Sequence, residues 1–91
     1  MASVTVELPS LLAPLVRTSS VPLEAETVAD ALEALVERHP ALRVHLFDET
    51  GGLRRHVLCF HNEANTPWAE SRAASLADRD RIRILQAVSG G

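Results

Sequence analysis

The sequence predicts an α+β fold in which a mixed sheet of four to five strands is covered on one face by a helix. Two observations support this prediction. The first and last apolar segments alternate with the period of a strand, and a central segment repeats apolar residues with the period of a helix. The 91 residues make a single domain, 1–91, because a chain of this length supports one small core.

Residues 3–8 form the first expected strand. Apolar and polar residues alternate strictly along it, and a proline at position 9 stops it. A period of two places every second side chain on one face of a sheet, so this strand is half buried. Its apolar face consists of Val4, Val6 and Leu8.

Residues 9–17 contain two prolines and several leucines, and we expect an ordered loop with Leu12 and Leu15 against the core. Residues 19–23 can form a second strand. Because Pro22 lacks an amide hydrogen, this strand is expected at an edge of the sheet.

A helix is expected next, after Thr27. The Thr27 side chain can cap its first turn, with Asp30 three residues on, as in a capping box. It ends at His39, because the residue before a proline disfavours helical geometry. The apolar residues at helical spacing are Val28, Ala31, Leu32, Leu35 and Val36.

The remaining elements complete the pattern. We expect a short helix over 41–48 with Leu42 and Leu46 inward, and a third strand over 54–61. After a polar, irregular stretch, a last strand covers 81–88. The order strand, strand, helix, strand, strand is that of a β-grasp fold.

The bulk composition excludes several functions. A net charge of −3 gives no electrostatic basis for binding nucleic acid or an anionic membrane. No apolar stretch approaches the roughly 20 residues of a membrane span, and we expect no signal peptide. A single cysteine fits a reducing cytoplasm, which is the expected location.

An ordinary active site is not evident in the sequence. The histidines have no metal-binding spacing with one another or with Cys59, so we expect no metal site. Gly51-Gly52 lies in a turn and is too short for a phosphate loop. Cys59 sits in the middle of the third strand, where a small buried thiol is favoured over a reactive one.

The end of the sequence carries the one distinctive signal. The last strand runs directly into Val88, Ser89, Gly90 and Gly91. Glycine has no Cβ, so a flexible tail of this kind can lie extended in a narrow channel of a partner enzyme. A terminal Gly-Gly is a weak signal alone, and its value depends on the strand before it.

The segment from Asp80 to Gly91 resembles the MoaD/ThiS-type family of ubiquitin-like sulfur-carrier proteins. Residues 56–63 resemble the third strand of that family, and the helix followed by residues 40–43 also fits. Two positions depart from the family pattern: Arg79 stands where a turn glycine is usual, and Gln86 stands where a proline is usual.

The resemblance implies a mechanism. A ubiquitin-activating-like enzyme adenylates the Gly91 carboxylate with ATP and Mg, and a sulfur donor then converts it to a thiocarboxylate. A sulfur-accepting synthase takes the sulfur. The chain itself binds no cofactor and needs no catalytic residue besides Gly91, because a thiocarboxylate is a good nucleophile. Val88, Ser89 and Gly90 thread the tail into the partner, and the chain is a carrier and not an enzyme.

The pleat predicts where partners dock. Ile82 and Ile84 are expected to face the helix, which leaves Leu85 and Arg83 on the outer face near Phe60. An apolar patch rimmed by arginine is typical of a protein interface, although such a residue can also be idle.

Three functions stay open. The leading one is sulfur donation to a biosynthetic pathway of the molybdopterin, cysteine or natural-product type. The second is a protein modifier joined to target lysines through Gly91. The third is a β-grasp binding subunit with an incidental Gly-Gly. All nine basic residues are arginine; this is either a composition bias or a way to avoid amines that compete for an activated C-terminus.

Overall fold

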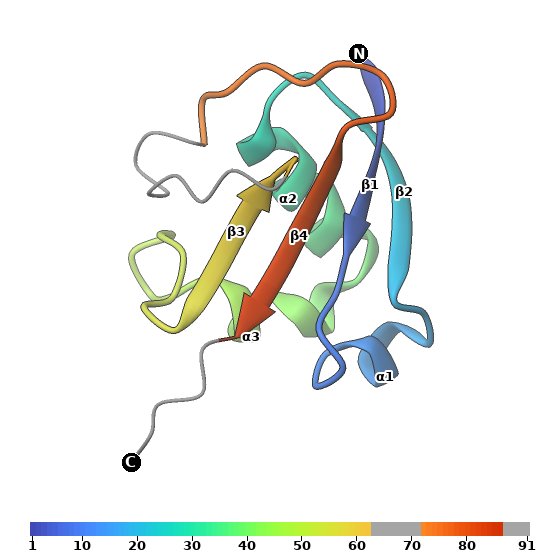
Figure 1. The fold of residues 1–91 in the computed structure, drawn as a ribbon. Helices are drawn as coiled ribbons and strands as arrows, with labels where there is room; N and C mark the ends of the chain where they lie inside the picture. The colour runs from blue at the N-terminus through green and yellow to red at the C-terminus, as the bar shows by residue number, and fades with distance from the viewer. Residues whose placement is uncertain (63–71, 87–91) are drawn as a thin grey trace.

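The computed structural model describes residues 1–62 and 72–86. These residues contain one four-stranded sheet in the order β2-β1-β4-β3 (Figure 1). β1 is parallel to β4 and antiparallel to β2, and β3 is antiparallel to β4. The sheet is therefore mixed, and the predicted α+β class is confirmed. The strands are β1 (Ala2–Glu7), β2 (Ser20–Ala25), β3 (Val57–His61) and β4 (Arg81–Gln86).

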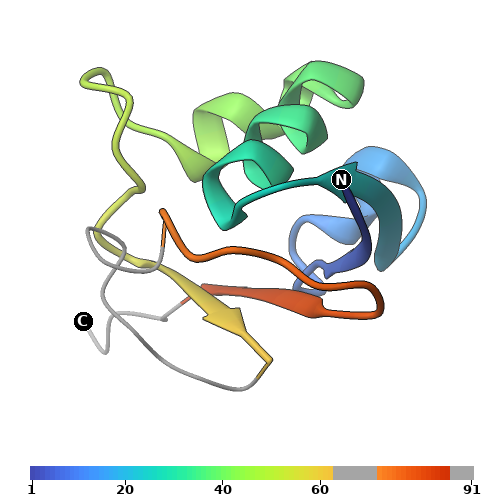
Figure 2. The ribbon, with the colours of Figure 1, turned by 90° about the horizontal axis from the view of Figure 1, so that it is seen from above.

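The main helix, α2 (Val28–Arg38), covers one face of this sheet (Figure 2). It begins at the predicted cap, where the Thr27 hydroxyl accepts a hydrogen bond from the Asp30 amide at 3.2 Å. It ends at His39, whose amide donates to the Leu35 carbonyl. All five apolar residues predicted for its inner stripe are buried. The helix expected from the sequence is thus confirmed in its bounds and in its face.

The core lies between α2 and the inner face of the sheet. Val6 of β1 pairs in register with Ile82 of β4, and both side chains are fully buried, as is Ile84. Complete burial of a Val or Ile side chain contributes about 1.5–3 kcal/mol. The inward direction predicted for the two isoleucines is confirmed, and it fixes the alternate residues of β4 on the outer face.

The segment 9–17 differs from the expected loop. It contains a short helix, α1 (Ala13–Val16), and only part of the expected packing. Leu12 is buried, but Leu15 is 45 % exposed, so the prediction that Leu15 packs on the core was wrong. Leu12 and Val16 are four residues apart and share a helical face, so both lie toward the core and Leu15 is turned away.

Between α2 and β3 lie a 3-10 turn, η1 (Pro40–Leu42), and a short helix, α3 (Arg43–Leu46). Leu42 and Leu46 are fully buried, as the sequence predicts. β3 begins at Val57 and not at Arg54, because the Val57 amide closes a turn on the Arg54 carbonyl at 3.0 Å.

β2 lies at one edge of the sheet, as Pro22 predicts, and extends to Ala25. Pro22 stands opposite Thr5 of β1 and has no amide hydrogen to donate. Its carbonyl accepts a hydrogen bond from Arg38 Nη1, at the end of α2, at 3.0 Å. The helix thus reaches over the sheet and occupies the exposed acceptor at the middle of the edge strand.

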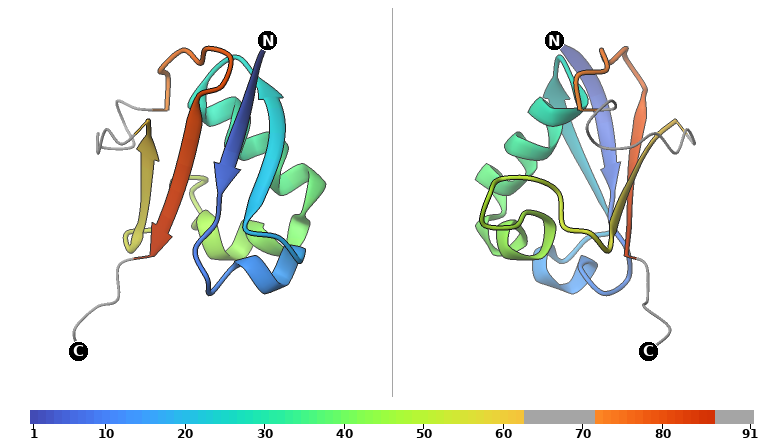
Figure 3. Two further views of the ribbon diagram at one scale, coloured as in Figure 1. Left: turned by 45° about the vertical axis from the view of Figure 1, so that its right-hand side comes forward. Right: turned by 90° about the vertical axis from the view of Figure 1, so that its left-hand side faces the viewer.

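The N-terminus and the last residue of β4, Gln86, lie at opposite ends of the sheet (Figures 1 and 3). This follows from the parallel pairing of β1 with β4, in which Thr5 is opposite Arg81. β4 was predicted to run through residue 88, and residues 87 and 88 lie outside the described residues. None of the helices within residues 1–62 and 72–86 has the length and apolarity needed to cross a membrane.

Candidate functional site

β4 carries two different faces. Its even-numbered residues Ile82 and Ile84 are buried against the core, whereas Arg81, Arg83 and Leu85 point outward. Leu85 is 36 % exposed, and an exposed apolar side chain is informative only where other apolar groups lie beside it. The strand therefore places an apolar residue on the open face of the sheet, close to the end of the chain.

The neighbouring strand β3 completes this face. Leu85 pairs with Leu58, and Arg83 pairs with Phe60. Residues diagonal to one another on adjacent strands lie within reach of an aromatic side chain, so Phe60 and Leu85 lie on either side of one depression. Its volume is about 220 Å³. It is lined by Glu7, Phe60, Asn62, Arg81, Arg83 and Leu85.

We call this depression the outer-face hollow. It contains all three residues that the sequence assigned to partner binding, Leu85, Arg83 and Phe60. It also contains Glu7, Asn62 and Arg81, which the sequence analysis did not select. The alternation of β1 and β4 does place Glu7 and Arg81 outward, but only the strand register shows that they share one site.

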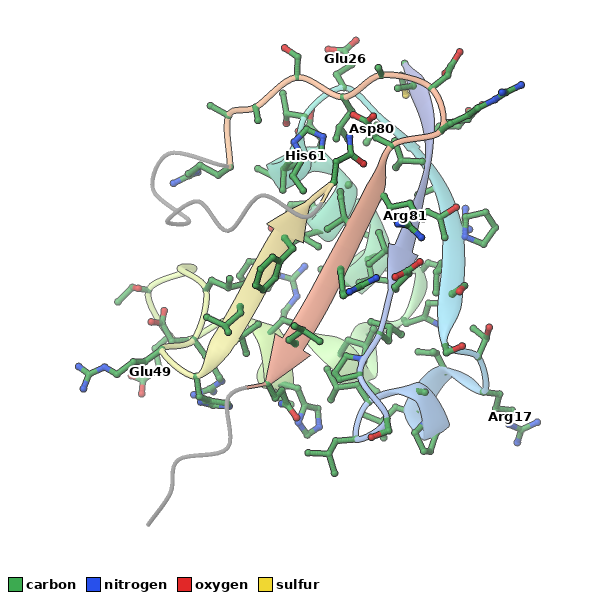
Figure 4. The ribbon with its side chains drawn as sticks, in the orientation of Figure 1. Arg17, Glu26, Glu49, His61, Asp80 and Arg81 are labelled. Atoms are coloured by element: carbon green, nitrogen blue, oxygen red, sulfur yellow. The ribbon has the colours of Figure 1, made fainter. Side chains whose placement is uncertain are left out.

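Glu7 holds the two arginines of the hollow. Its carboxylate accepts a hydrogen bond from Arg83 Nε at 3.1 Å, and Arg81 Nη1 lies 3.5 Å from its second oxygen. Glu7 and Arg83 are paired in register across β1 and β4, and Figure 4 shows Arg81 projecting from β4 toward β1. The arginine side chains remain about half exposed, so water competes for them and these ion pairs contribute little to stability.

The predicted reactive group and its tail lie outside the described residues. These are Gly91 and the residues assigned to tail threading, Val88, Ser89 and Gly90. The last described residue, Gln86, pairs with Val57 at the end of the sheet and is adjacent to Leu85 in the chain. Five residues span at most about 18 Å when fully extended. An enzyme that acts on Gly91 must therefore approach close to this end of β4.

A second polar cluster lies at the start of β4, around Asp80. Its carboxylate accepts hydrogen bonds from the Ala77 amide at 2.9 Å and the Asn62 side chain at 2.8 Å, and it lies 2.8 Å from His61 Nε2. The hydrogen bonds from Ala77, Asn62 and His61 lower the pKa of Asp80 to about 2. Figure 4 shows His61 and Asp80 side by side where β3 ends and β4 begins.

The turn before Asp80 contains one of the two departures from the family pattern. Arg79 has φ of +74°, a conformation that favours glycine. Its amide donates to the Ser3 carbonyl at 2.8 Å. The turn therefore keeps the left-handed backbone conformation that glycine adopts most easily. In this chain Arg79 adopts it instead, at a cost in backbone strain.

Cys59 and the histidines do not form a reactive site. Cys59 is buried beside Val57, and burial raises the pKa of its thiol to about 11. The sequence prediction of a buried thiol is confirmed. Among residues 1–62 and 72–86, no three His, Cys, Asp or Glu side chains are grouped so that they could hold a metal ion.

A larger and more open depression of about 650 Å³ lies near Met1, between β1, β2 and the end of α2. It contains none of the residues predicted for function. Its arginine from α2, Arg38, is bonded to a backbone carbonyl of the edge strand. It also lies at the end of the sheet away from Gln86, so we assign the function to the smaller outer-face hollow.

Comparison with known protein families identifies the family of this chain. A model of the ThiS family matches residues 6–91, which is nearly the whole chain and includes both the hollow and the Gly-Gly end. The chain belongs to the ThiS family. The resemblance inferred from the sequence is confirmed.

Two characterised relatives of this ThiS-family chain carry different names. Small archaeal modifier protein 1 of Haloferax volcanii is 37 % identical over 76 residues, which cover 82 % of this chain and 83 % of the relative. The sulfur carrier protein CysO of Mycobacterium tuberculosis is 29 % identical over 92 residues, covering 98 % of this chain and 99 % of the relative. These names correspond to the first two functions that the sequence left open.

Solved structures agree with the fold of this ThiS-family chain. The crystal structure of the Haloferax volcanii modifier has a TM-score of 0.86 at 30 % identity, covering 99 % of this chain and all of the other. CysO in the BexX/CysO complex of Amycolatopsis orientalis has a TM-score of 0.83 at 28 % identity, covering 97 % of this chain and 99 % of the other. The predicted β-grasp fold is confirmed, and one similar protein has been crystallised in a complex with a partner protein.

Proposed function

We propose that this chain is a sulfur carrier that works through the C-terminal carboxylate of Gly91. The single observation that carries the proposal is a ThiS-family domain whose last strand contributes to a partly apolar surface hollow and leads into a Gly-Gly terminus. The hollow offers a surface for docking, and the terminal carboxylate offers the group that is modified.

The proposed chemistry takes place at the terminal carboxylate. One carboxylate oxygen of Gly91 attacks the α-phosphorus of ATP held with Mg by an adenylating enzyme, and pyrophosphate leaves. A persulfide sulfur then attacks the carbonyl carbon of the acyl-adenylate, and AMP leaves. Reduction of the resulting acyl-disulfide by a thiol frees the thiocarboxylate. All catalytic groups belong to the partner enzymes, and the carrier contributes reach and a docking surface.

The described residues and the sequence of the tail support this division of labour. The one cysteine is buried and its pKa is raised to about 11, so it is a poor candidate for the sulfur-bearing group. Glycine at the last two positions lets the chain enter a narrow channel, because it has no Cβ. The carrier is then acted on by an adenylating enzyme and by a sulfur-accepting synthase, both of which use the same terminus.

In the sequence comparison, the match to the sulfur carrier covers more of this chain than the match to the archaeal modifier, and this favours the carrier function. The match to the sulfur carrier protein CysO covers 98 % of this chain and 99 % of the relative. We therefore place the chain with carriers of the cysteine type, ahead of the molybdopterin and natural-product types, and in the cytoplasm where thiols stay reduced. The modifier function is supported by the higher identity to the archaeal modifier and remains the second candidate.

The test uses the full chain with an adenylating enzyme from the same genome, ATP, Mg and a persulfide donor. We expect chain-dependent exchange of pyrophosphate into ATP, and replacement of one oxygen by sulfur in the intact mass. Deletion of Gly91 removes about 3.3–3.6 Å of reach, and a misplacement of 1 Å can cost about a hundredfold in rate. The deletion should abolish both signals while the circular dichroism spectrum stays unchanged.

The same samples separate the alternatives. Conjugates to lysines of other proteins, without a gain of sulfur, identify a modifier. A chain that supports no pyrophosphate exchange and gains no mass is a binding subunit with an incidental Gly-Gly, and this result would overturn the proposal.

A further inference from the structure

The outer-face hollow differs in charge from the rest of the molecule. The chain as a whole has a net charge of −3. Within the hollow, by contrast, the guanidinium groups of Arg81 and Arg83 face the single carboxylate of Glu7. Two positive charges against one negative charge leave the hollow with a local excess of one positive charge. An acidic protein thus presents a basic site on the face that was selected for docking.

The hollow is also amphipathic. Phe60 and Leu85 form its apolar part, and the two arginines form its polar part. Its volume of about 220 Å³ is enough for one large side chain and one neighbouring carboxylate, but not for a helix. The arginines are about half exposed and Glu7 is less so, which leaves guanidinium groups accessible to a second carboxylate.

We propose that this hollow binds an acidic segment of the adenylating enzyme, in which an apolar side chain enters between Phe60 and Leu85 and an adjacent Asp or Glu binds Arg83 and Arg81. Glu7 is the residue that sets the affinity: it holds the arginines in place and occupies them in the free chain. The inference rests on the proposed function and specifies the chemistry of its partner.

Other occupants of the hollow fit less well. A second copy of this chain would bring the arginines of one hollow against those of the other, and like charges at close range are repulsive. Nucleic acid would meet a chain with an overall negative charge and only two arginines in the hollow. A carboxylate next to an apolar side chain satisfies both halves of the site.

The experiment measures binding of the adenylating enzyme, from the concentration of chain that gives half-maximal pyrophosphate exchange. Arg83→Gln should weaken binding by about tenfold, because the proposed ion pair with the carboxylate of the partner is lost. Glu7→Gln should strengthen binding about threefold, because it removes a competing charge and keeps an oxygen that can accept from Arg83. Glu24→Gln is the matched control: Glu24 is on the outer face of β2 and does not line the hollow, so it should change binding less than twofold.

Salt gives an independent measure. Binding of the wild-type chain should weaken as ionic strength rises, and the dependence should be steeper for Glu7→Gln. A weaker interaction for Glu7→Gln, or no change for Arg83→Gln, overturns the acidic partner segment even if the chain is adenylated normally. If the wild-type chain supports no pyrophosphate exchange, the proposed function itself is overturned. Melting temperatures of the three variants confirm that each one is folded.

Discussion

His61 Nε2 lies 2.8 Å from a carboxylate oxygen of Asp80, and this contact joins the end of β3 to the start of β4. Asp80 also accepts from the Ala77 amide and from the Asn62 side chain, so one carboxylate holds together the turn and both strand ends. These bonds lie at the end of β4 away from the tail. They act on the position of the strand and not on the chemistry at Gly91.

Asp80→Asn should therefore lower the free energy of unfolding by about 1–2 kcal/mol at pH 7, because the amide replaces one acceptor oxygen by a donor that faces other donors. Chemical denaturation with urea measures the difference. Glu49→Gln, at an exposed position without a described ion pair, is the control for loss of one negative charge. An equal stability of the two variants would contradict the role given to Asp80.

The pH dependence of stability follows from the same group. The folded state lowers the pKa of Asp80 from 3.8 to about 2. The unfolded chain thus binds a proton at a higher pH than the folded chain, and the stabilisation is complete above about pH 4 and is lost as the pH falls toward 2. The wild type should lose stability across this window more steeply than Asp80→Asn. Parallel curves would show that Asp80 is not the group responsible.

Arg79→Gly should stabilise the domain. A left-handed backbone costs a non-glycine residue about 1–2 kcal/mol, while glycine loses about 0.5–1 kcal/mol through its extra freedom in the unfolded chain. The expected net gain is about 0.5–1 kcal/mol, measured by thermal unfolding. Arg55→Gly, at an exposed turn residue without positive φ, is the control and should destabilise. A loss of stability in Arg79→Gly would show that its side chain does more than fill the turn.

Cys59 should be unreactive in the folded protein. Its pKa of about 11 keeps the thiol protonated at pH 8, and the side chain is 5 % exposed. A thiol reagent should modify it only on the timescale of unfolding, and Cys59→Ala should keep thiocarboxylate formation at a cost of about 1 kcal/mol in stability. If a folded Cys59→Ala chain no longer gained sulfur, the assignment of the sulfur to Gly91 would be wrong.

Leu85→Asp tests the apolar half of the outer-face hollow. Leu85 is 36 % exposed, so the variant should fold, and the affinity for the adenylating enzyme should fall about tenfold or more because a charge replaces a central apolar contact. Val44→Asp makes the same change at a residue that is 65 % exposed on α3 and does not line the hollow. If both substitutions lowered the affinity to a similar extent, the outer face would not be the docking surface.

Periodicity predicted most of the fold, because burial follows the period of each element. The face of α2, the inward isoleucines of β4 and the edge position of β2 were all readable in this way. The position of Leu15 could not be predicted in this way, because a single turn of helix is too short to show a period. Its neighbour Val16 packs against the core instead. Local pattern decides a face only when an element is long enough to repeat it.

The candidate site was only partly predictable for a related reason. Arg83, Leu85 and Phe60 could be placed on the outer face from their own strands. The contact between Glu7 and Arg83 depends on the parallel register of β1 and β4, and those strands are more than seventy residues apart. Nothing in either segment specifies that offset, so a site made by pairing distant strands emerges only from the assembled sheet.

The hydrogen bond from Arg38 to the Pro22 carbonyl affects how strongly the chain aggregates at high concentration. An open sheet edge is a template on which another strand can add, and repeated addition leads to fibrils. At the centre of β2 the proline offers no donor and the guanidinium occupies the acceptor. The domain can therefore expose the partly apolar outer-face hollow to its partners, while the β2 edge resists the addition of strands from other copies.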